Sequence, residues 1–190
     1  MALVYTVGHG ARPAAALIDL LAAQGVAWLV DVRAYPVSRR HPQFERARLE
    51  ASLGEAGIRY QWQGKALGGF RTPRTGSPHG ALEEPAFRGF ADHMQTEAFR
   101  AAVAEILSLA QQAPLALMCA EQAPQRCHRS LIADYLCACG NPVVHLLQPG
   151  MSVRHRLHPA ARWTPEGLVY DGGRVQARLD FTGSGSPGSR

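Results

Sequence analysis

The sequence contains no long apolar run. None of its apolar stretches approaches the roughly 20 residues that a membrane-spanning helix needs. The first residues, Met1 to Tyr5, also lack the basic cluster that precedes the apolar part of a secretory signal peptide. We therefore expect a soluble, cytoplasmic protein without a membrane partner.

Cysteine is scarce as well. The four cysteines of this 190-residue chain do not form the dense pattern of a disulfide-stabilised domain, and Cys137 and Cys139 lie beside apolar residues of an expected helix. Hydrophobic residues make up 46% of the chain, which is enough for one core. We expect a single domain over residues 1–180 and a flexible tail over residues 181–190, which are rich in Gly and Ser.

Lysine is almost absent: Lys65 is the only one, and the other nineteen of the twenty basic residues are arginines. The net charge of +5 is compatible with nucleic-acid binding. The arginines are dispersed, however, and their densest group is only Arg33, Arg39 and Arg40. A nucleic-acid-associated binding protein is therefore an alternative and not the leading hypothesis.

Short apolar runs alternate with amphipathic stretches, which is typical of an α/β fold with a mostly parallel sheet. Strands are expected at Leu3–Val7, Ala27–Val32, Ile58–Trp62, Leu115–Cys119 and, as the last one, Val143–Leu147. Helices are expected from Pro13 to about Gln24, from Phe44 to Ala56, from a Thr96 cap to Gln112, and over Cys127–Cys139. The segment from Gly64 to Pro85 has no periodicity and is expected to be a long loop that covers a site.

Reactive side chains follow the ends of the expected strands. His9 follows the first strand, Arg33 ends the second, and Cys119 and Glu121 follow the fourth. Parallel strands place their carboxyl ends at one edge of a sheet, so these residues are expected to share one cleft. Arg33 is either the ion-pair partner of Asp31 or a ligand for phosphate or carboxylate.

The segment Cys127-His128-Arg129 places cationic residues at an expected helix start. Cations are disfavoured there because the unpaired N–H groups already carry partial positive charge, whereas a bound anion reverses the interaction. We therefore expect a small anionic ligand, phosphorylated or nucleotide-like. The residues expected to bind it are His9, Arg33, Cys119 and Arg129.

The same helix start favours chemistry at a thiol. A helix N-terminus and neighbouring cations lower a thiol pKa, so Cys127 is the candidate nucleophile, although buried cysteines often only pack. His128 is the candidate general acid or base, with Glu121 to orient it. The catalytic candidates are thus Cys127, His128 and Glu121, while the sequence does not establish that the protein is an enzyme.

Zinc is a third hypothesis, in the form of a metal-dependent hydrolase. Cys119, Cys127, His128 and His9 are ligand types that zinc prefers. The spacing of the two cysteines matches no compact zinc module, and the arginines beside them would repel a cation. No metal site is therefore predicted, and the sequence indicates neither a cofactor nor an oligomeric state.

Several segments together resemble one known family, the domain-of-unknown-function 488 family. They are Tyr5-Thr6-Val7-Gly8-His9, Asp31-Val32-Arg33 with Pro36 and Ser38-Arg39, Leu67-Gly68-Gly69 with Arg71, and Cys119-Ala120-Glu121 with Pro124 and Cys127-His128-Arg129. The resemblance runs from about residue 3 to residue 147, and the last element is its most specific part. It implies a three-layer α/β, Rossmann-like fold with helices on both faces of the sheet, in a bacterial-type cytoplasmic protein. It transfers no reaction.

Overall fold

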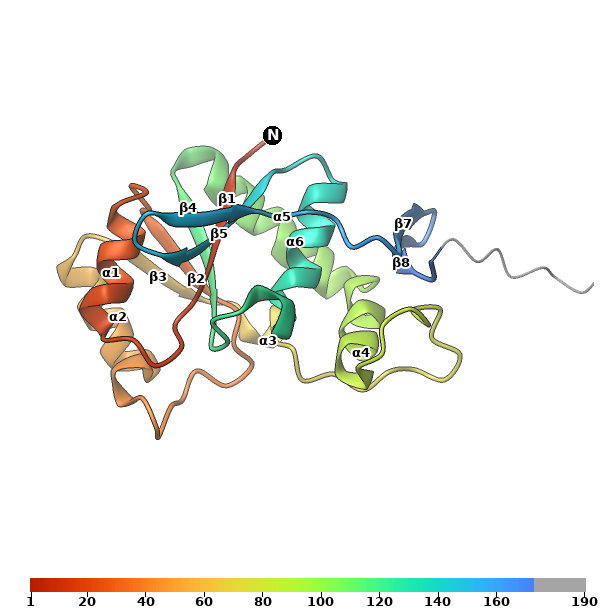
Figure 1. Cartoon of the computed structure of the whole chain (residues 1–190), viewed down its shortest axis with the longest axis horizontal. Helices are drawn as coiled ribbons and strands as arrows, with labels where there is room; N and C mark the ends of the chain where they lie inside the picture. Colours follow the sequence, from red (N-terminus) through yellow and green to blue (C-terminus); the bar gives the residue numbers. More distant parts are fainter. Residues whose placement is uncertain (173–190) are drawn as a thin grey trace, which may run out of the picture.

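The computed structural model describes residues 1–172 and has a six-stranded sheet at its centre (Figure 1). The strands are β1 (Val4–Gly8), β2 (Trp28–Asp31), β3 (Arg59–Trp62), β4 (Leu115–Cys119), β5 (Val143–Gln148) and β6 (Met151–Arg154). Their order is β3-β2-β4-β1-β5-β6, and only the edge strand β6 is antiparallel to its neighbour. The sheet therefore has the mostly parallel arrangement that the sequence pattern predicted.

Helices cover both faces of this sheet (Figure 1). The helices are α1 (Ala14–Ala22), α2 (Arg46–Glu55), α3 (Gly64–Leu67), α4 (Pro85–Met94), α5 (Glu97–Gln112) and α6 (Arg129–Ala138), with short 3-10 turns at Pro42–Phe44 and Pro124–Arg126. Buried side chains of α1 and α2 pack on one face of the sheet, and those of α4, α5 and α6 pack on the other. The alternation of side chains along β4 separates the two layers, because Leu117 faces one and Met118 the other. The expected three-layer fold is confirmed.

Helix ends follow the local signals of the sequence. The Thr96 side chain caps α5 by accepting a hydrogen bond of 3.3 Å from the backbone N–H of Phe99, as predicted. Gly57 and Gly140 follow α2 and α6 with φ angles of 74° and 81°. Only glycine adopts such angles without strain, so these two residues end their helices as expected.

Three expectations about the elements were wrong. Helix α6 begins at Arg129 instead of Cys127, because a 3-10 turn ends at Arg126 and leaves Cys127 in extended backbone. Helix α4, which starts at Pro85 where the expected loop ends, was not predicted from the sequence. The segment expected to be a loop also contains the short helix α3. The strand at Val143 is not the last one, because β6 and the hairpin of β7 (Ala161–Thr164) and β8 (Gly167–Tyr170) follow.

Every residue of β6 is exposed, so this strand lacks the apolar pattern of a buried strand, whereas β8 is short but buries Leu168, Val169 and Tyr170. The expected tail at residues 181–190 lies outside the described residues. Within residues 1–172, no helix is both long and apolar enough to cross a membrane.

Candidate functional site

The carboxyl ends of β1, β2 and β4 meet at one edge of the sheet. The backbone N–H of His9 donates to the carbonyl of Cys119 at 2.9 Å, and that of Val32 donates to Met118 at 2.9 Å. Gly8 lies so close to the loop after β4 that a Cβ atom there would be 1.8 Å from the carbonyl oxygen of Glu121. The strand ends expected to converge therefore do lie side by side, and the backbones that follow β1 and β4 are hydrogen-bonded to each other.

Cys119, Cys127 and His128 form a compact group at this edge, here named the thiol cluster. Their ligand atoms all lie within 4.8 Å of one another, and all three side chains are buried. The Nδ1 atom of His128 is 3.7 Å from Sγ of Cys127 and 3.9 Å from Sγ of Cys119. The strand end and the start of α6 thus bring together two thiols that lie eight positions apart in the sequence.

A backbone carbonyl fixes the orientation of His128. Its Nε2 atom donates to the carbonyl oxygen of Val32 at 3.2 Å, so in the neutral imidazole the lone pair is on Nδ1, facing the two sulfur atoms. Gly69 lies directly against the ring, since a Cβ atom there would be 2.5 Å from Nδ1. The ring of Phe90 packs edge-on at 4.9 Å. The imidazole is therefore held in place on several sides.

The two thiols differ in acidity. A hydrogen bond from Cys119 is the largest influence on Cys127 and lowers its pKa from 9.0 to about 7, against the opposing effect of burial. The charge and backbone N–H of Arg129 lower it further. The same hydrogen bond, together with burial, raises the pKa of Cys119. Cys119 is therefore the S–H donor and Cys127 the thiolate of this pair.

Arg129 explains how a cation is accommodated at the start of α6. Its side chain is fully buried, and its guanidinium donates to the backbone carbonyls of Glu121 and, at 2.8 Å, of Gln122. Its backbone N–H points to Sγ of Cys127 at 3.5 Å. The lowered pKa of Cys127 places an ionisable sulfur beside this helix start, and the carbonyl oxygens direct the negative ends of their dipoles at the guanidinium.

Glu121 is placed differently from the expectation. Its side chain is exposed, and it contributes a backbone carbonyl to Arg129. Glu121 was expected to orient His128, and the carbonyl of Val32 is the group that accepts the hydrogen bond from its Nε2 atom. The structure therefore does not bring the Glu121 carboxylate to the thiol cluster.

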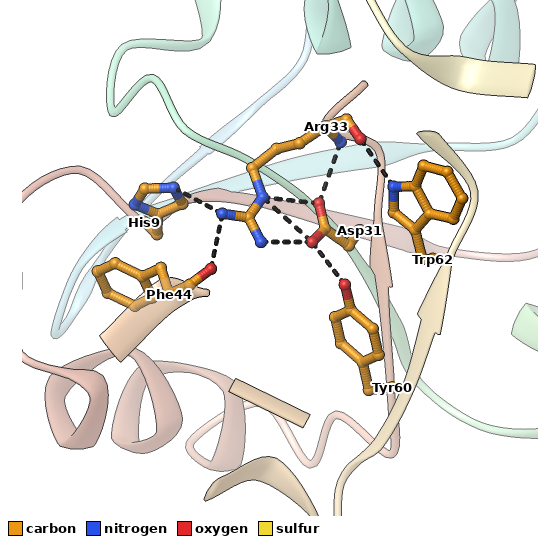
Figure 2. A network of polar contacts seen from close by, with 6 residues as sticks. All are labelled: His9, Asp31, Arg33, Phe44, Tyr60 and Trp62. Atoms are coloured by element: carbon orange, nitrogen blue, oxygen red, sulfur yellow. Dashed lines mark hydrogen bonds and ion pairs between the residues drawn. The ribbon is translucent and has the colours of Figure 1, made fainter. Parts of the chain in front are cut away.

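Arg33 belongs to a separate buried network (Figure 2). Its guanidinium pairs with Asp31, with an Nε–Oδ1 distance of 2.9 Å, and also donates to the Phe44 carbonyl at 2.9 Å. Tyr60 donates its hydroxyl to the other oxygen of Asp31 at 2.7 Å. Of the two roles that the sequence left open for Arg33, the ion pair is the one present in this structure.

His9 joins the same network (Figure 2). Its ring stacks on Phe44 at 4.2 Å between centroids, and its Nε2 atom lies 3.3 Å from the Arg33 guanidinium. Burial is the main reason that its pKa is lowered to about 4, so the ring is neutral at pH 7 and accepts a hydrogen bond from Arg33. His9 and Arg33 thus brace each other near the thiol cluster.

Sequence reasoning missed a second polar chain beneath α6. The Thr6 hydroxyl lies 2.6 Å from Nδ1 of His145, whose Nε2 is 2.9 Å from Nδ1 of His155, and His155 pairs with Asp134 at 2.8 Å. His145 lies in β5, and both of its ring nitrogens have hydrogen-bond partners. The spacing of His155 and Asp134 in the sequence gives no sign that they form a hydrogen-bonded chain with His145. A cavity of about 1220 Å³, lined in part by His145, His155 and Asp134, lies beside this chain.

Together, these observations define an α/β domain with a buried thiol cluster at the carboxyl edge of its sheet. A family model described as Domain of unknown function DUF488 matches residues 13–136. The chain therefore belongs to this family, as its motifs indicated. No curated protein and no solved structure matches the chain.

Proposed function

We propose that this domain is a thiol-dependent enzyme that acts on a small anionic ligand at the carboxyl edge of its sheet. Cys127 is the nucleophile, Cys119 stabilises its thiolate, and His128 accepts the thiol proton. The observation that carries the proposal is the geometry at Cys127, whose Sγ lies 3.7 Å from Nδ1 of His128 and 3.5 Å from the backbone nitrogen of Arg129. In agreement with it, the Cys119 hydrogen bond and Arg129 lower the pKa of Cys127 to about 7, although burial opposes ionisation. A thiol near neutrality is reactive at physiological pH, whereas an ordinary buried cysteine is inert.

The position of His128 supports its role as the proton acceptor. Its Nδ1 atom lies 3.7 Å from Sγ of Cys127 and carries the lone pair of the neutral ring. A nucleophile beside a base that a third group orients is the recurring arrangement of covalent catalysis. Here the orienting group is the carbonyl of Val32.

Access to the thiol requires movement of its cover. Cys127 is only 3% exposed, and Gly69 lies against the adjacent imidazole. We place the opening at the segment from Gly68 to Phe70, because Gly69 lies against the imidazole that neighbours Cys127. A cover of this kind also excludes water from a reactive thiolate.

Arg12 and Arg129 support the anionic nature of the ligand. The Nε atom of each is buried and has no hydrogen-bond partner among residues 1–172. Burial and, next, the positive charge of Arg129 lower the pKa of Arg12, so the two guanidinium groups repel each other. An oxyanion between them would accept hydrogen bonds from both Nε–H groups and remove that repulsion.

Alkylation tests the nucleophile. Native protein is treated with iodoacetamide at pH 7, and the modified cysteines are identified by peptide mapping. Cys127 should react faster than Cys137 and Cys139, whose pKa values burial raises, although Cys139 is exposed. A native Cys127 that stays unmodified while Cys139 reacts contradicts the proposal.

Phosphate tests the anionic ligand. At about 100 times its dissociation constant, a ligand of the folded state adds about 2.7 kcal/mol of stability, which appears as a higher melting temperature. Arg12→Ala should abolish most of this shift, and Arg48→Ala, an exposed arginine on α2, should not. If phosphate, pyrophosphate and mononucleotides leave the melting temperature of the wild type unchanged, the anionic-ligand part fails.

Zinc binding is a second candidate for the thiol cluster. A tetrahedral zinc ion, with bonds of about 2.3 Å to sulfur and about 2.0 Å to nitrogen, separates its ligand atoms by about 3.6 Å. The distances from Nδ1 of His128 to the two sulfur atoms, 3.7 and 3.9 Å, are close to this value. The sequence spacing predicted no metal, because it did not show that Cys119 approaches His128.

Metal analysis of gently purified protein separates the two candidates. Stoichiometric zinc that is lost in Cys119→Ser and in His128→Ala favours the metal site. Metal-free protein with a fast-reacting Cys127 favours the nucleophile.

A further inference from the structure

Two aromatic side chains are exposed near the thiol cluster. Tyr35 is 70% exposed and Phe70 is 79% exposed, and their ring centroids are 5.9 Å apart. They lie 35 positions apart in the sequence and belong to different loops, one after β2 and one after α3. Large aromatic rings usually bury most of their surface, so an exposed pair in mutual contact indicates a surface that is used for binding.

The backbone around both rings contacts the thiol cluster. On the first loop, the Val32 carbonyl accepts from His128, three residues before Tyr35. On the second loop, Gly69 lies against the His128 ring directly before Phe70, and a Cβ atom at Gly68 would be 2.7 Å from Ala34. The aromatic pair is therefore attached to the same two loop segments that enclose the imidazole.

The second loop is braced by its own arginine. Arg71 donates to the carbonyl oxygen of Gly68 at 3.1 Å and to that of Lys65 at 2.7 Å. These bonds fix the turn that presents Phe70. Arg71 thus holds the backbone of the segment that carries Phe70.

The two chain segments that carry the pair contain basic residues and no acidic residue. Residues 32–44 and 56–82, which include both loops, have no Asp or Glu. Arg39, Arg40 and Lys65 are exposed, and none of them forms an ion pair within residues 1–172. Arg39 and Arg40 follow Tyr35 by four and five residues, and Lys65 precedes Phe70 by five. Exposed basic residues on the same two loops as an exposed aromatic pair favour a ligand that combines an aromatic plane with negative charge.

We infer that this surface, the aromatic rim, consisting of Tyr35, Phe70, Arg39, Arg40 and Lys65, binds a nucleotide. The base stacks on the rings, and the phosphate pairs with the basic side chains. The inference rests on the proposed function in one respect, since it names the substrate class that is brought to Cys127. A free nucleotide and a nucleotide of a single strand present the same base and phosphate, so the rim would bind either of them by the same contacts.

Fluorescence anisotropy tests the aromatic rim directly. The probes are a labelled oligothymidylate and an abasic oligomer with the same label and number of phosphates, and thymidine monophosphate is the competitor. The double variant Tyr35→Ala/Phe70→Ala should weaken binding of the oligothymidylate about tenfold or more and leave the abasic oligomer unchanged. Trp163→Ala, which removes an exposed aromatic ring on β7, is the matched control and should bind as the wild type does.

Arg39→Ala/Arg40→Ala should weaken both oligomers, and Arg48→Ala/Arg100→Ala, two exposed arginines on α2 and α5, should weaken neither. If thymidine monophosphate displaces the labelled oligothymidylate at a nucleotide concentration similar to that of an unlabelled oligomer, the ligand is a free nucleotide. If only oligomers displace the probe, the ligand is a single strand. Both outcomes support the rim as a nucleotide site.

Three results would overturn the inference. They are no binding of any nucleotide probe, equal binding of thymidylate and abasic oligomers, and a double aromatic variant that retains full affinity. Failure of the proposed function is visible separately: iodoacetamide reports on Cys127 without a nucleotide, and Cys127→Ser should retain oligothymidylate binding.

Discussion

Replacing Cys119 should change the acidity of its neighbour. In the structure, the S–H group of Cys119 is the largest influence that lowers the pKa of Cys127. Cys119→Ala removes this donor. Burial, which raises the pKa of Cys127, is then opposed only by Arg129, which lowers it. The pKa of Cys127 should therefore rise from about 7 toward or beyond its ordinary value of 9.0.

The magnitude follows from the ionised fraction. A shift of two pKa units corresponds to about 2.7 kcal/mol of preference for the thiolate. With a pKa of about 7, about half of Cys127 is thiolate at pH 7. With an ordinary value, only about 1% is ionised, so the rate of alkylation at this pH should fall up to about 50-fold.

The pH dependence of iodoacetamide modification measures the change, and Cys119→Ser is the control. A serine hydroxyl retains a hydrogen-bond donor at nearly the same position, so this variant should keep most of the lowered pKa. Cys139 provides an internal reference in each sample. If Cys119→Ala and the wild type give the same modification profile for Cys127, the assigned donor is wrong.

Two further predictions concern stability. Arg33→Met should lower the free energy of unfolding by about 3–5 kcal/mol in urea titrations, because it leaves the buried Asp31 carboxylate without its charged partner; a loss below about 1 kcal/mol would contradict this. The wild type should also lose stability as pH falls from about 6.5 to about 4. Burial lowers the pKa of His9 to about 4 and that of His145 to about 3 in the folded protein. The unfolded chain therefore binds these two protons at a higher pH than the folded protein does, which favours unfolding. His145→Gln should make this pH dependence shallower, and an unfolding midpoint that is constant over that range would refute the assignment.

The convergence of the strand ends could be predicted from the sequence, and the contacts within it could not. Alternating apolar runs indicated parallel strands, and parallel strands bring His9, Arg33 and Cys119 to one edge whatever the strand order is. Side-chain partners depend on rotamers and loop paths, which carry no periodic signal. The Arg33–Asp31 pair could be anticipated because both residues are on one strand and project to the same face.

The start of α6, with its cationic residues, shows most clearly what could not be predicted from the sequence. The rule that first-turn cations need an anion led to a bound ligand in contact with Arg129. The structure places backbone carbonyls of Glu121 and Gln122 there, and it places the Cys127 sulfur at the N–H group of Arg129. Carbonyl oxygens occur in every residue, so no residue type in the sequence could reveal that this particular loop turns them inward.

Direct titration of the Cys127 thiol tests the central claim of this account. Thiolate ions absorb in the ultraviolet, so the absorbance of wild-type protein and of Cys127→Ser is followed as pH is raised. The wild type should show an ionisation step at about pH 7 that the variant lacks, because only Cys127 among the cysteines has a lowered pKa among residues 1–172. Identical titration curves for the two proteins, with no thiolate formed below about pH 9, would contradict a reactive thiol at this site.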